Sequence, residues 1–536
     1  MSETIDSAIE AWKRALGHHA VSDAPEILTR YARSTSPRPG TQPACILYPT
    51  YREQVQEIVR IAGENGVPLY PISRGRNWGY GDACAPGNSV AIVDLSRMNQ
   101  IIELDRELGY AVIEPGVTQR QFYEHVRAYA PEYWVDITGA GDEASLVGNI
   151  VDRGFGHTPY GDHIRSNCGL EVVLPDGRLL DTGFGHFEGA RAARVFPYGV
   201  GPQLDGLFVQ SSLGIVTKAC IWLYPAPDAL NCFYIKVDDE EALWPLVDAL
   251  RPLRMNGMLN SAVHIGNDLR VVSAHGHFPW ELTDGKAPLP QDVRLRLRHE
   301  AGVGAWNITG SITGTRRQVA EASRALRRGV AGRAKGIFLN DWRLAAAGWL
   351  ARKLHFIRAG QVLARQVEAL LPNYGLLKGV PTNIPLMGTQ WRLRNPSPTP
   401  PENPLDTPCG LIWISPVLPM RGSDAKRVLS IVEPLFDQYG FDFLATFTLL
   451  NERSMVGVFN ISFDKTLEEE CAAAEACYKA VLGRLVAEGY IPYRTGLQGM
   501  QALAQPGDTF WETAQAIKRA VDPGNIMSPG RYIPPV

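Results

Sequence analysis

The sequence predicts an α+β protein with two main domains. Its 536 residues are too many for one hydrophobic core, and a hydrophobic fraction of 45% is ordinary for a globular chain. Short apolar strands mixed with helical periodicity fill residues 43–226, whereas residues 231–489 alternate strands with long amphipathic helices. We therefore expect domains at 1–230 and 231–489, followed by a turn-rich C-terminal segment at 490–536.

The first domain begins with a strand, a helix and a second strand. Residues 44–49 are an apolar run, residues 51–66 place Val55 and Ile58 on one helical face, and residues 67–73 form the next strand. A glycine-rich loop follows at 74–81. Further strands are expected at 89–95, 110–116, 170–183 and 215–225, with an Asp-Gly hairpin turn at 176–177.

The second domain is dominated by helical periodicity. Long helices are expected within 242–253, 315–332 and 424–440. Residues 388–407 are rich in proline and polar side chains, which predicts a long surface loop or an oligomer contact.

Composition excludes several classes of function. The formal net charge of −3 and the pI of about 6.4 provide no global basic field for nucleic acid or anionic lipid. Eight cysteines are scattered without a CxxC pair, so we expect reduced thiols and no metal site. No apolar stretch reaches the roughly 18 residues of a membrane span, and the N-terminus lacks a secretory pattern. We expect a cytoplasmic protein, with periplasmic export beside a partner as the alternative.

Two glycine-rich segments compete for a phosphate-binding role. In the loop at 74–81, backbone N–H groups can converge on a pyrophosphate and Arg74 and Arg76 can add charge, although a tight structural turn would look the same. The second, at 139–144, matches GxGxxA, and Asp162 stands where the fingerprint's acidic residue is expected. Glycines soon interrupt the helix that should follow, so we interpret 139–144 as a false match.

A set of motifs resembles one family over nearly the whole chain. They are PISRGRNWGYG, AVIEPGVT, GNIVDRGFGHTPYGDH, FPYGVGPQLDGLFVQSSLGIVTK, FDFLATFT, PYRT and DPGNIMSPGR. Their order is similar to that of vanillyl-alcohol oxidase, eugenol oxidase and 4-cresol dehydrogenase. The resemblance implies a two-domain FAD-binding fold in which residues 1–230 and 490–536 bind the cofactor and residues 231–489 form a substrate cap.

The same resemblance assigns cofactor contacts and supports the loop at 74–81 as the pyrophosphate cradle. The implied FAD-binding residues are Ser73, Arg74, Gly75, Arg76, Asn77, Trp78, Gly79, Glu114, Pro115, Gly116, Val117, Ser145, Gly148, Asn149, Arg153, Gly214, Ile215, Val216 and Arg531.

Three residues match the family's phenol-binding positions: Tyr80, Tyr493 and Arg494. A phenol has a pKa near 10, and its phenolate is far more electron-rich. Two hydroxyl donors and a guanidinium would favour the anion. The implied reaction is hydride transfer from the para carbon to flavin N5, through a para-quinone methide. Trp413, Thr446 and Arg531 match other pocket positions, although an aromatic residue and a threonine on strands more often serve plain packing. His157 stands where vanillyl-alcohol oxidase has a tyrosine, and it is either a polar pocket residue that changes charge near neutral pH or a histidine packed beneath the flavin.

The sequence departs from the family at two functional positions. Counting back from Ser415, Leu411 occupies the site of the histidine that links covalently to FAD in the oxidases, so we expect dissociable FAD unless Cys409 or another residue replaces it. The aspartate near flavin N5 falls at Gly139 or Ala140, and Asp142 lies close by. The base for the reaction is therefore unassigned.

Three functions compete. The leading hypothesis is oxidation of 4-alkylphenols or 4-hydroxybenzylic alcohols, with dioxygen or a c-type cytochrome subunit as the acceptor. A flavin dehydrogenase of 2-hydroxy acids or sugars would share the loop but would not need the tyrosine and arginine trio. A non-catalytic FAD-fold binding protein is the third hypothesis. We further expect a homodimer.

Overall fold

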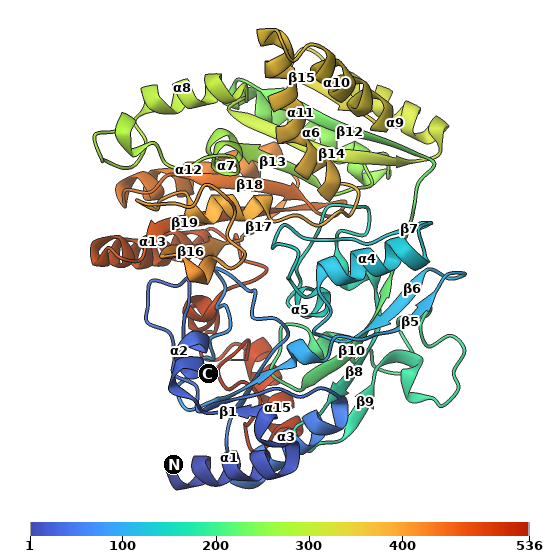
Figure 1. Cartoon of the computed structure of the whole chain (residues 1–536), viewed down its shortest axis with the longest axis vertical. Helices are drawn as coiled ribbons and strands as arrows, with labels where there is room; N and C mark the ends of the chain where they lie inside the picture. Colours follow the sequence, from blue (N-terminus) through green and yellow to red (C-terminus); the bar gives the residue numbers. More distant parts are fainter. Residues whose placement is uncertain (1, 534–536) are drawn as a thin grey trace.

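The computed structural model describes residues 2–533 and has two halves (Figure 1). The lower half contains both chain ends, coloured blue and red, and the upper half is formed by the middle of the sequence. Helices and sheets occur in both halves, and among the described residues only the first sheet of the lower half contains parallel strands, which confirms the predicted α+β class. The final three residues of the expected segment 490–536 lie outside the described residues.

The first sheet of the lower half contains the strand, helix, strand unit expected from the sequence. Its strand order is β1 (Val21–Ser22), β2 (Cys45–Leu47), β4 (Ala91–Asp94) and β3 (Leu69–Ile72), and the last three strands are parallel. Helix α3 (Arg52–Asn65) connects β2 to β3 and buries the apolar face that includes Val55 and Ile58. It packs beside α1 (Ser2–Leu16), and α2 (Pro25–Tyr31) lies against β2.

The second sheet of the lower half is antiparallel. Its order is β5 (Ile101–Asp105), β6 (Tyr110–Ile113), β10 (Ile215–Trp222), β8 (Asn167–Val173) and β9 (Leu179–Asp181). Helices α4 (Gln119–Tyr129) and α5 (Leu146–Val151) share its core, and β7 (Tyr133–Trp134) pairs with β11 (Tyr224–Pro225). Only six residues of helix follow the segment 139–144, whereas a dinucleotide fingerprint requires a long helix. The interpretation of that segment as a false match is confirmed.

The C-terminal segment returns to the lower half. The Leu69 backbone N–H donates to the Ile526 carbonyl at 2.7 Å, and the Ser528 N–H donates to the Leu69 carbonyl at 2.8 Å. Helices α14 (Met500–Leu503) and α15 (Thr509–Val521) precede this contact. Residues near 494 and 531 are thereby held close to the glycine-rich loop that follows β3.

One large sheet forms the upper half. Its order is β15 (Lys335–Leu339), β12 (Ala229–Val237), β14 (Trp306–Gly314), β13 (Val263–Asn267), β18 (Leu444–Leu449), β19 (Ser454–Asp464) and β16 (Cys409–Ile414), with β17 (Val417–Pro419) also pairing with β19. Apolar faces of α6 (Leu243–Met255), α9 (Arg316–Val330), α12 (Gly422–Gln438) and α13 (Glu468–Ala487) pack on this sheet in one core. The helices expected within 242–253, 315–332 and 424–440 are thus confirmed.

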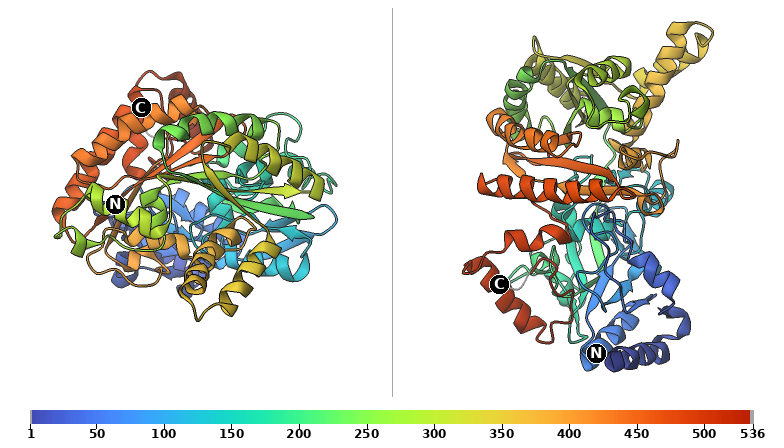
Figure 2. Two further views of the ribbon diagram at one scale, coloured as in Figure 1. Left: turned by 90° about the horizontal axis from the view of Figure 1, so that it is seen from above. Right: turned by 90° about the vertical axis from the view of Figure 1, so that its left-hand side faces the viewer.

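The remaining helices extend the upper half. Helices α7 (Asp268–Ser273) and α8 (Gln291–Ala301) contact each other, and the short 3-10 helix η8 (Ile384–Gln390) contacts α7. Helices α10 (Asp341–Lys353) and α11 (Arg358–Leu376) form a hairpin that projects from the body at the top right of Figure 2. Within residues 2–533, no helix combines the length and apolarity needed to cross a membrane.

Candidate active site

A cavity of about 1170 Å³ lies where the two halves meet. Its lower wall comes from the loop after β3, from α5 and its flanking loops, and from the C-terminal segment. Its upper wall comes from strands of the large sheet and from α7, α11 and η8. A cavity of this size between two lobes can hold a large cofactor and a small substrate together.

Most of the predicted cofactor residues line this cavity. They are Ser73, Arg74, Gly75, Arg76, Asn77, Trp78, Ser145, Gly148, Asn149, Gly214, Val216 and Arg531. At Gly148 a side chain would crowd Ser73, because an added Cβ would lie 3.0 Å from the Ser73 hydroxyl oxygen. The loop and the start of α5 therefore approach each other closely beside the cavity.

The other predicted cofactor residues lie behind the cavity wall. Gly116 packs against the carbonyls of Leu95, Ser96 and Met98, and the Ser145 hydroxyl donates to the Pro115 carbonyl at 2.6 Å. Glu114, Val117 and Ile215 are buried without lining the cavity, Gly79 packs on an indole, and Arg153 is exposed. The turn at 114–117 thus supports Ser145, the N-cap of α5.

The two competing glycine-rich segments contact each other. Arg74 forms an ion pair of 2.5 Å with Glu143, which belongs to the rejected segment 139–144. Asp142 pairs with Arg120 on the surface and does not line the cavity, whereas Gly139 and Ala140 do. Asp142 is therefore engaged elsewhere and is not available as the base left unassigned by the sequence.

Tyr80, Tyr493 and Arg494 come together at one corner of the cavity. The Arg494 guanidinium carbon lies 4.2 Å from the centre of the Tyr80 ring. Ser415, at the end of β16, joins the two tyrosines: its hydroxyl shares a 2.5 Å hydrogen bond with the Tyr80 hydroxyl, and its carbonyl accepts the Tyr493 backbone N–H at 3.1 Å. Tyr80 is thus held beside Tyr493 and Arg494, which are distant from it in the sequence.

Burial keeps both tyrosines protonated. It raises the pKa of the Tyr80 hydroxyl well above its ordinary value, and the neighbouring Tyr493 adds to this effect. Burial also raises the pKa of Tyr493, against the opposing influence of the Arg494 charge. Both side chains are neutral at physiological pH, so each has a hydroxyl proton to donate.

Arg494 has a carboxylate partner that the sequence analysis missed. Asp152 pairs with Arg494 and lies 3.8 Å from an Arg531 nitrogen. Burial alone would lower the pKa of the Arg494 guanidinium, but Asp152 and the nearby tyrosines outweigh burial, and the pKa is raised. Two guanidinium groups face one carboxylate, so the corner keeps one positive charge in excess.

Asn77 and Tyr532 complete this corner. Asn77 donates to Asp152 at 3.0 Å and accepts a hydrogen bond from Arg494, while the Tyr532 hydroxyl donates to Asp152. Asp152, Ser415 and Tyr532 were not among the predicted site residues. A carboxylate inside the motif GNIVDRG was the available signal for Asp152, and nothing in the local sequence indicated Ser415.

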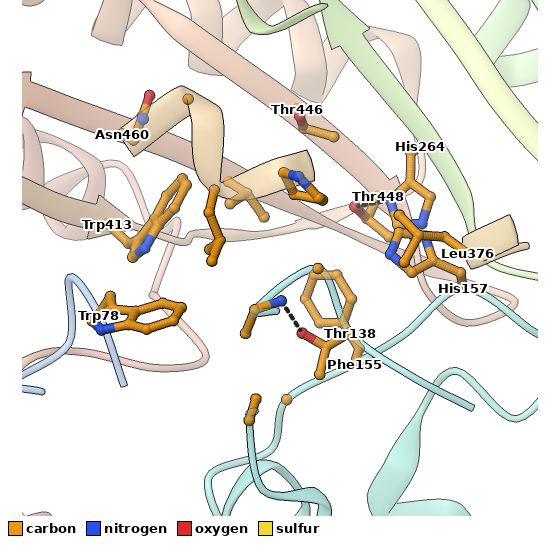
Figure 3. A pocket seen from close by; sticks show the side chains of 18 of the residues that line it. Trp78, Thr138, Phe155, His157, His264, Leu376, Trp413, Thr446, Thr448 and Asn460 are labelled. Atoms are coloured by element: carbon orange, nitrogen blue, oxygen red, sulfur yellow. Dashed lines mark hydrogen bonds between the residues drawn. The ribbon is translucent and has the colours of Figure 1, made fainter. Parts of the chain in front are cut away.

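The remaining predicted pocket residues line the upper part of the cavity (Figure 3). Trp78 and Trp413 lie at one end of this view, and His157 and His264 lie at the other, with Thr446 on the strand above. Gly79 must lack a side chain because a Cβ there would overlap the Trp413 indole. This contact fixes Trp413 beside the loop that carries Tyr80.

His157 is neutral, and its ring lies against that of a second histidine at a tilted angle. Its ring centre lies 4.5 Å from that of His264, and burial lowers the pKa of His157 to about 4 despite the opposing charge of Asp136. Within residues 2–533, the His157 Nδ1 atom is buried without a hydrogen-bond partner. His157 is therefore not a side chain that changes charge near neutral pH, and it lines the cavity in its neutral form.

Leu411 faces the cavity from β16. It packs with Trp78 and Trp413, and it has no atom that could form a bond to a flavin. The Cys409 thiol, two residues earlier, donates to the Pro404 carbonyl at 3.3 Å and does not line the cavity. Neither side chain therefore offers a covalent anchor.

Comparison with known proteins identifies the cofactor. Residues 43–183 match the family model described as "FAD binding domain". The chain is 35% identical to 1'-carboxy-chondrochloren decarboxylase of Chondromyces crocatus, covering 99% of this chain and 98% of that protein. It is 32% identical to the flavoprotein subunit of 4-cresol dehydrogenase [hydroxylating] of Pseudomonas putida, covering 98% and 95%.

Solved structures agree over the full length. Substrate-bound p-cresol methylhydroxylase superposes with a TM-score of 0.87 at 31% identity, covering 99% of this chain and 97% of that one. The 4-ethylphenol oxidase of Gulosibacter chungangensis, solved with isoeugenol, gives 0.89 at 27% identity with the same coverage. The fold and the matched domain define a flavin-dependent oxidoreductase. The chain belongs to the family of vanillyl-alcohol oxidase and 4-cresol dehydrogenase, as its motifs predicted.

Proposed function

We propose that this enzyme oxidises the benzylic carbon of para-substituted phenols. The observation that carries the proposal is the convergence of Tyr80, Tyr493 and Arg494 at one corner of the cavity. Two relatives that span the chain are named for 4-cresol and 4-ethylphenol, and both compounds are para-alkylphenols. A dehydrogenase of 2-hydroxy acids would have no use for two hydroxyl donors beside a guanidinium at a ring oxygen.

The cavity fits FAD. The lining residues between Ser73 and Trp78 would hold the pyrophosphate with backbone N–H groups, and Ser145 and Gly148, at the capped start of α5, would form the neighbouring wall. When bound, the flavin supplies a two-electron acceptor at N5 for the hydride. We propose that the FAD is non-covalent because Leu411 has no linking atom. Acid precipitation should then release yellow FAD into the supernatant, and a fluorescent band on a denaturing gel would contradict this.

The protein's own residues activate the substrate. Tyr80 and Tyr493 donate hydrogen bonds to the phenolic oxygen, and the excess positive charge shared by Arg494 and Arg531 favours its ionised form. The phenolate pushes electron density toward the para carbon, so the benzylic hydride leaves and the substrate becomes a para-quinone methide. The Ser415 hydroxyl, bonded to Tyr80, offers a route for the phenolic proton. His157, neutral and with a free nitrogen, is our candidate to direct water or accept the product proton.

A single anaerobic experiment tests this function. The purified yellow protein is mixed with 4-ethylphenol, and the visible absorption of the oxidised flavin is followed in time. We expect bleaching by 4-ethylphenol and none by its methyl ether or by D-lactate. Bleaching by D-lactate alone would favour the 2-hydroxy acid alternative. Spectral perturbation by 4-ethylphenol without bleaching would favour a non-catalytic binding protein.

The electron acceptor and the oligomeric state are further parts of the proposal. One relative is named as an oxidase and another as a flavoprotein subunit, so dioxygen and a c-type cytochrome are both candidates. We favour dioxygen and a cytoplasmic homodimer. Hydrogen peroxide formation as fast as reduction of an artificial dye would support dioxygen, and a much slower rate would support the cytochrome.

The names of the relatives cover two kinds of para substituent. Cresol and ethylphenol carry neutral alkyl groups, whereas the name of the Chondromyces crocatus relative denotes a carboxylated compound. We propose 4-hydroxyphenyl compounds as the substrate class. The charges that line the cavity bear on whether the para substituent is a neutral alkyl group or a carboxylate.

A further inference from the structure

Arg270 brings a positive charge into the upper part of the cavity. It lies in α7, lines the cavity, and is partly accessible to it. Its guanidinium carbon lies 5.5 Å from the centre of the Trp413 ring. Trp413 also packs on Gly79, next to Tyr80, so one indole contacts both Arg270 and the loop of the phenol corner.

The charge of Arg270 has no partner within residues 2–533. It makes no ion pair there, and its guanidinium donates no hydrogen bond; burial alone lowers its pKa to about 10. Other buried arginines have partners for their terminal guanidinium nitrogens, although the Nε atoms of Arg254, Arg392 and Arg494 have none among the described residues. Arg254 donates to three backbone carbonyls, Arg392 pairs with Asp442 and Glu470, and Arg494 pairs with Asp152.

Small and polar groups surround this guanidinium. A Cβ at Gly388 would lie 3.2 Å from Arg270 Nη1 and 3.5 Å from the Ser273 hydroxyl oxygen, so the guanidinium rests against glycine backbone in η8. A Cβ at Gly266 would lie 3.7 Å from Arg270 Cγ and 3.8 Å from the Thr446 hydroxyl oxygen. At neutral pH Arg270 stays charged. A buried charge without a partner destabilises the folded protein unless an anionic ligand pairs with it.

We propose that Arg270 binds a carboxylate on the substituent para to the phenolic hydroxyl, so that the substrate is a 4-hydroxyphenyl compound with an acidic side chain. This inference rests on the proposed phenol oxidation and names its substrate class. A guanidinium matches a carboxylate in shape and charge, and such hydrogen bonds are about twice as strong as neutral ones. Arg494 and Arg270 would then hold the two ends of one substrate.

The charge of Arg270 also reaches the histidine pair. Burial lowers the pKa of His264 well below its ordinary value, and His157 and Arg270 lower it further while Asp136 opposes them. His264 and His157 are therefore neutral neighbours of Arg270 and do not compete with it for an anion. Figure 3 shows both imidazoles at the end of the view away from Trp78.

The test compares an acid with its neutral ester. The probes are 3-(4-hydroxyphenyl)propanoate and its methyl ester, with 4-ethylphenol as the reference for the phenol reaction. Anaerobic flavin reduction is measured for each as a second-order rate constant. We expect wild-type protein to prefer the acid over the ester by about ten-fold or more. In Arg270→Gln this ratio should fall to within about two-fold, and Arg270→Lys should keep part of it because the charge is retained.

Lys335 provides the matched control. It is an exposed cation that lines the cavity from β15, so Lys335→Gln removes the same formal charge without touching the guanidinium. The acid-to-ester ratio should be unchanged in this variant. An equal fall in Lys335→Gln would show long-range attraction in place of a carboxylate site and would overturn the inference.

The remaining outcomes separate this inference from the proposed function. Failure of the acid, the ester and 4-ethylphenol alike to reduce the flavin would reject the phenol reaction itself. Reduction by 4-ethylphenol with equal rates for acid and ester would reject only the carboxylate site. Loss of FAD from both Arg270→Gln and Arg270→Lys would show that Arg270 binds the cofactor, and it would also reject the carboxylate site.

Discussion

Arg494 and Arg270 lie in the same cavity and face opposite electrostatic surroundings. Arg494 is paired with Asp152, bonded to Asn77 and packed on Tyr80. Arg270 touches an aromatic face and, among residues 2–533, has no carboxylate beside it. An arginine that is already paired with a carboxylate is held in one position, as catalysis requires. An arginine without a counter-ion can instead pair with an anionic ligand and strengthen its binding. The difference predicts which substitutions harm folding and which harm selectivity.

Removing the partner of Arg494 should have the largest effect on stability. Asp152→Ala leaves Arg494 and Arg531 together without a carboxylate, and breaking such a buried pair costs about 3–5 kcal/mol. The measurement is the free energy of unfolding from chemical denaturation. Asp142→Ala is the control, because its pair with exposed Arg120 should be worth less than about 1 kcal/mol. Equal losses in both variants would contradict the assigned role of Asp152.

Arg494→Ala should slow catalysis strongly. A hydrogen bond to a charged group is worth roughly 1.5–3 kcal/mol, so anaerobic flavin reduction by 4-ethylphenol should fall by about ten-fold to more than a hundred-fold. Raising the pH toward about 10 should restore part of the rate, because solution then supplies phenolate directly. The rate is measured against pH at a temperature where the variant is folded and retains FAD. A rate equal to wild type at every pH would remove the phenolate site.

Removing the charge of Arg270 should not destabilise the protein, in contrast to removing Asp152. Arg270→Met keeps the length of the side chain and removes the unpaired charge, so the free energy of unfolding should stay equal or rise by about 1 kcal/mol. Chemical denaturation of the FAD-loaded protein measures this change. A loss of several kcal/mol would mean that Arg270 supports the fold.

Tyr493→Phe should have the smallest effect. It removes one neutral donor, worth about 0.5–1.5 kcal/mol, so flavin reduction should slow by about two-fold to about ten-fold. The FAD content should not change, since the Tyr493 side chain is not part of the cradle. A loss larger than that of Arg494→Ala, with FAD retained, would instead indicate that Tyr493 carries the transferred proton.

The predicted residues that come together at the cavity are those that stand in short motifs. Tyr80, Tyr493 and Arg494 belong to such motifs and line one cavity, and the loop at 74–78 follows a strand in the expected order. The roles of Asp152, Ser415 and Arg270 depend on contacts across the fold, so the motif GNIVDRG could draw attention to Asp152 but could not show that it pairs with Arg494. Asp152 meets Arg494 from 342 positions away, and Ser415 meets Tyr80 across 335 positions. A local sequence pattern does not indicate which residues so far apart in the chain will be in contact.

The His157 alternatives show the same limit. A histidine in GHTPYGDH could be a titrating pocket residue or a packed one, and sequence alone could not decide between them. The decisive factor is burial, which lowers the pKa of His157 to about 4 and keeps the imidazole neutral, while the ring lies against that of His264. His264 comes from β13, in the other half of the molecule.

The most direct test of the account is hydride removal from the benzylic carbon. Anaerobic flavin reduction should be compared for 4-ethylphenol and for the same compound carrying deuterium on both benzylic positions. The account predicts that deuteration slows flavin reduction several-fold, because the measured step breaks that C–H bond. Equal rates for the two compounds, with bleaching observed for both, would contradict it.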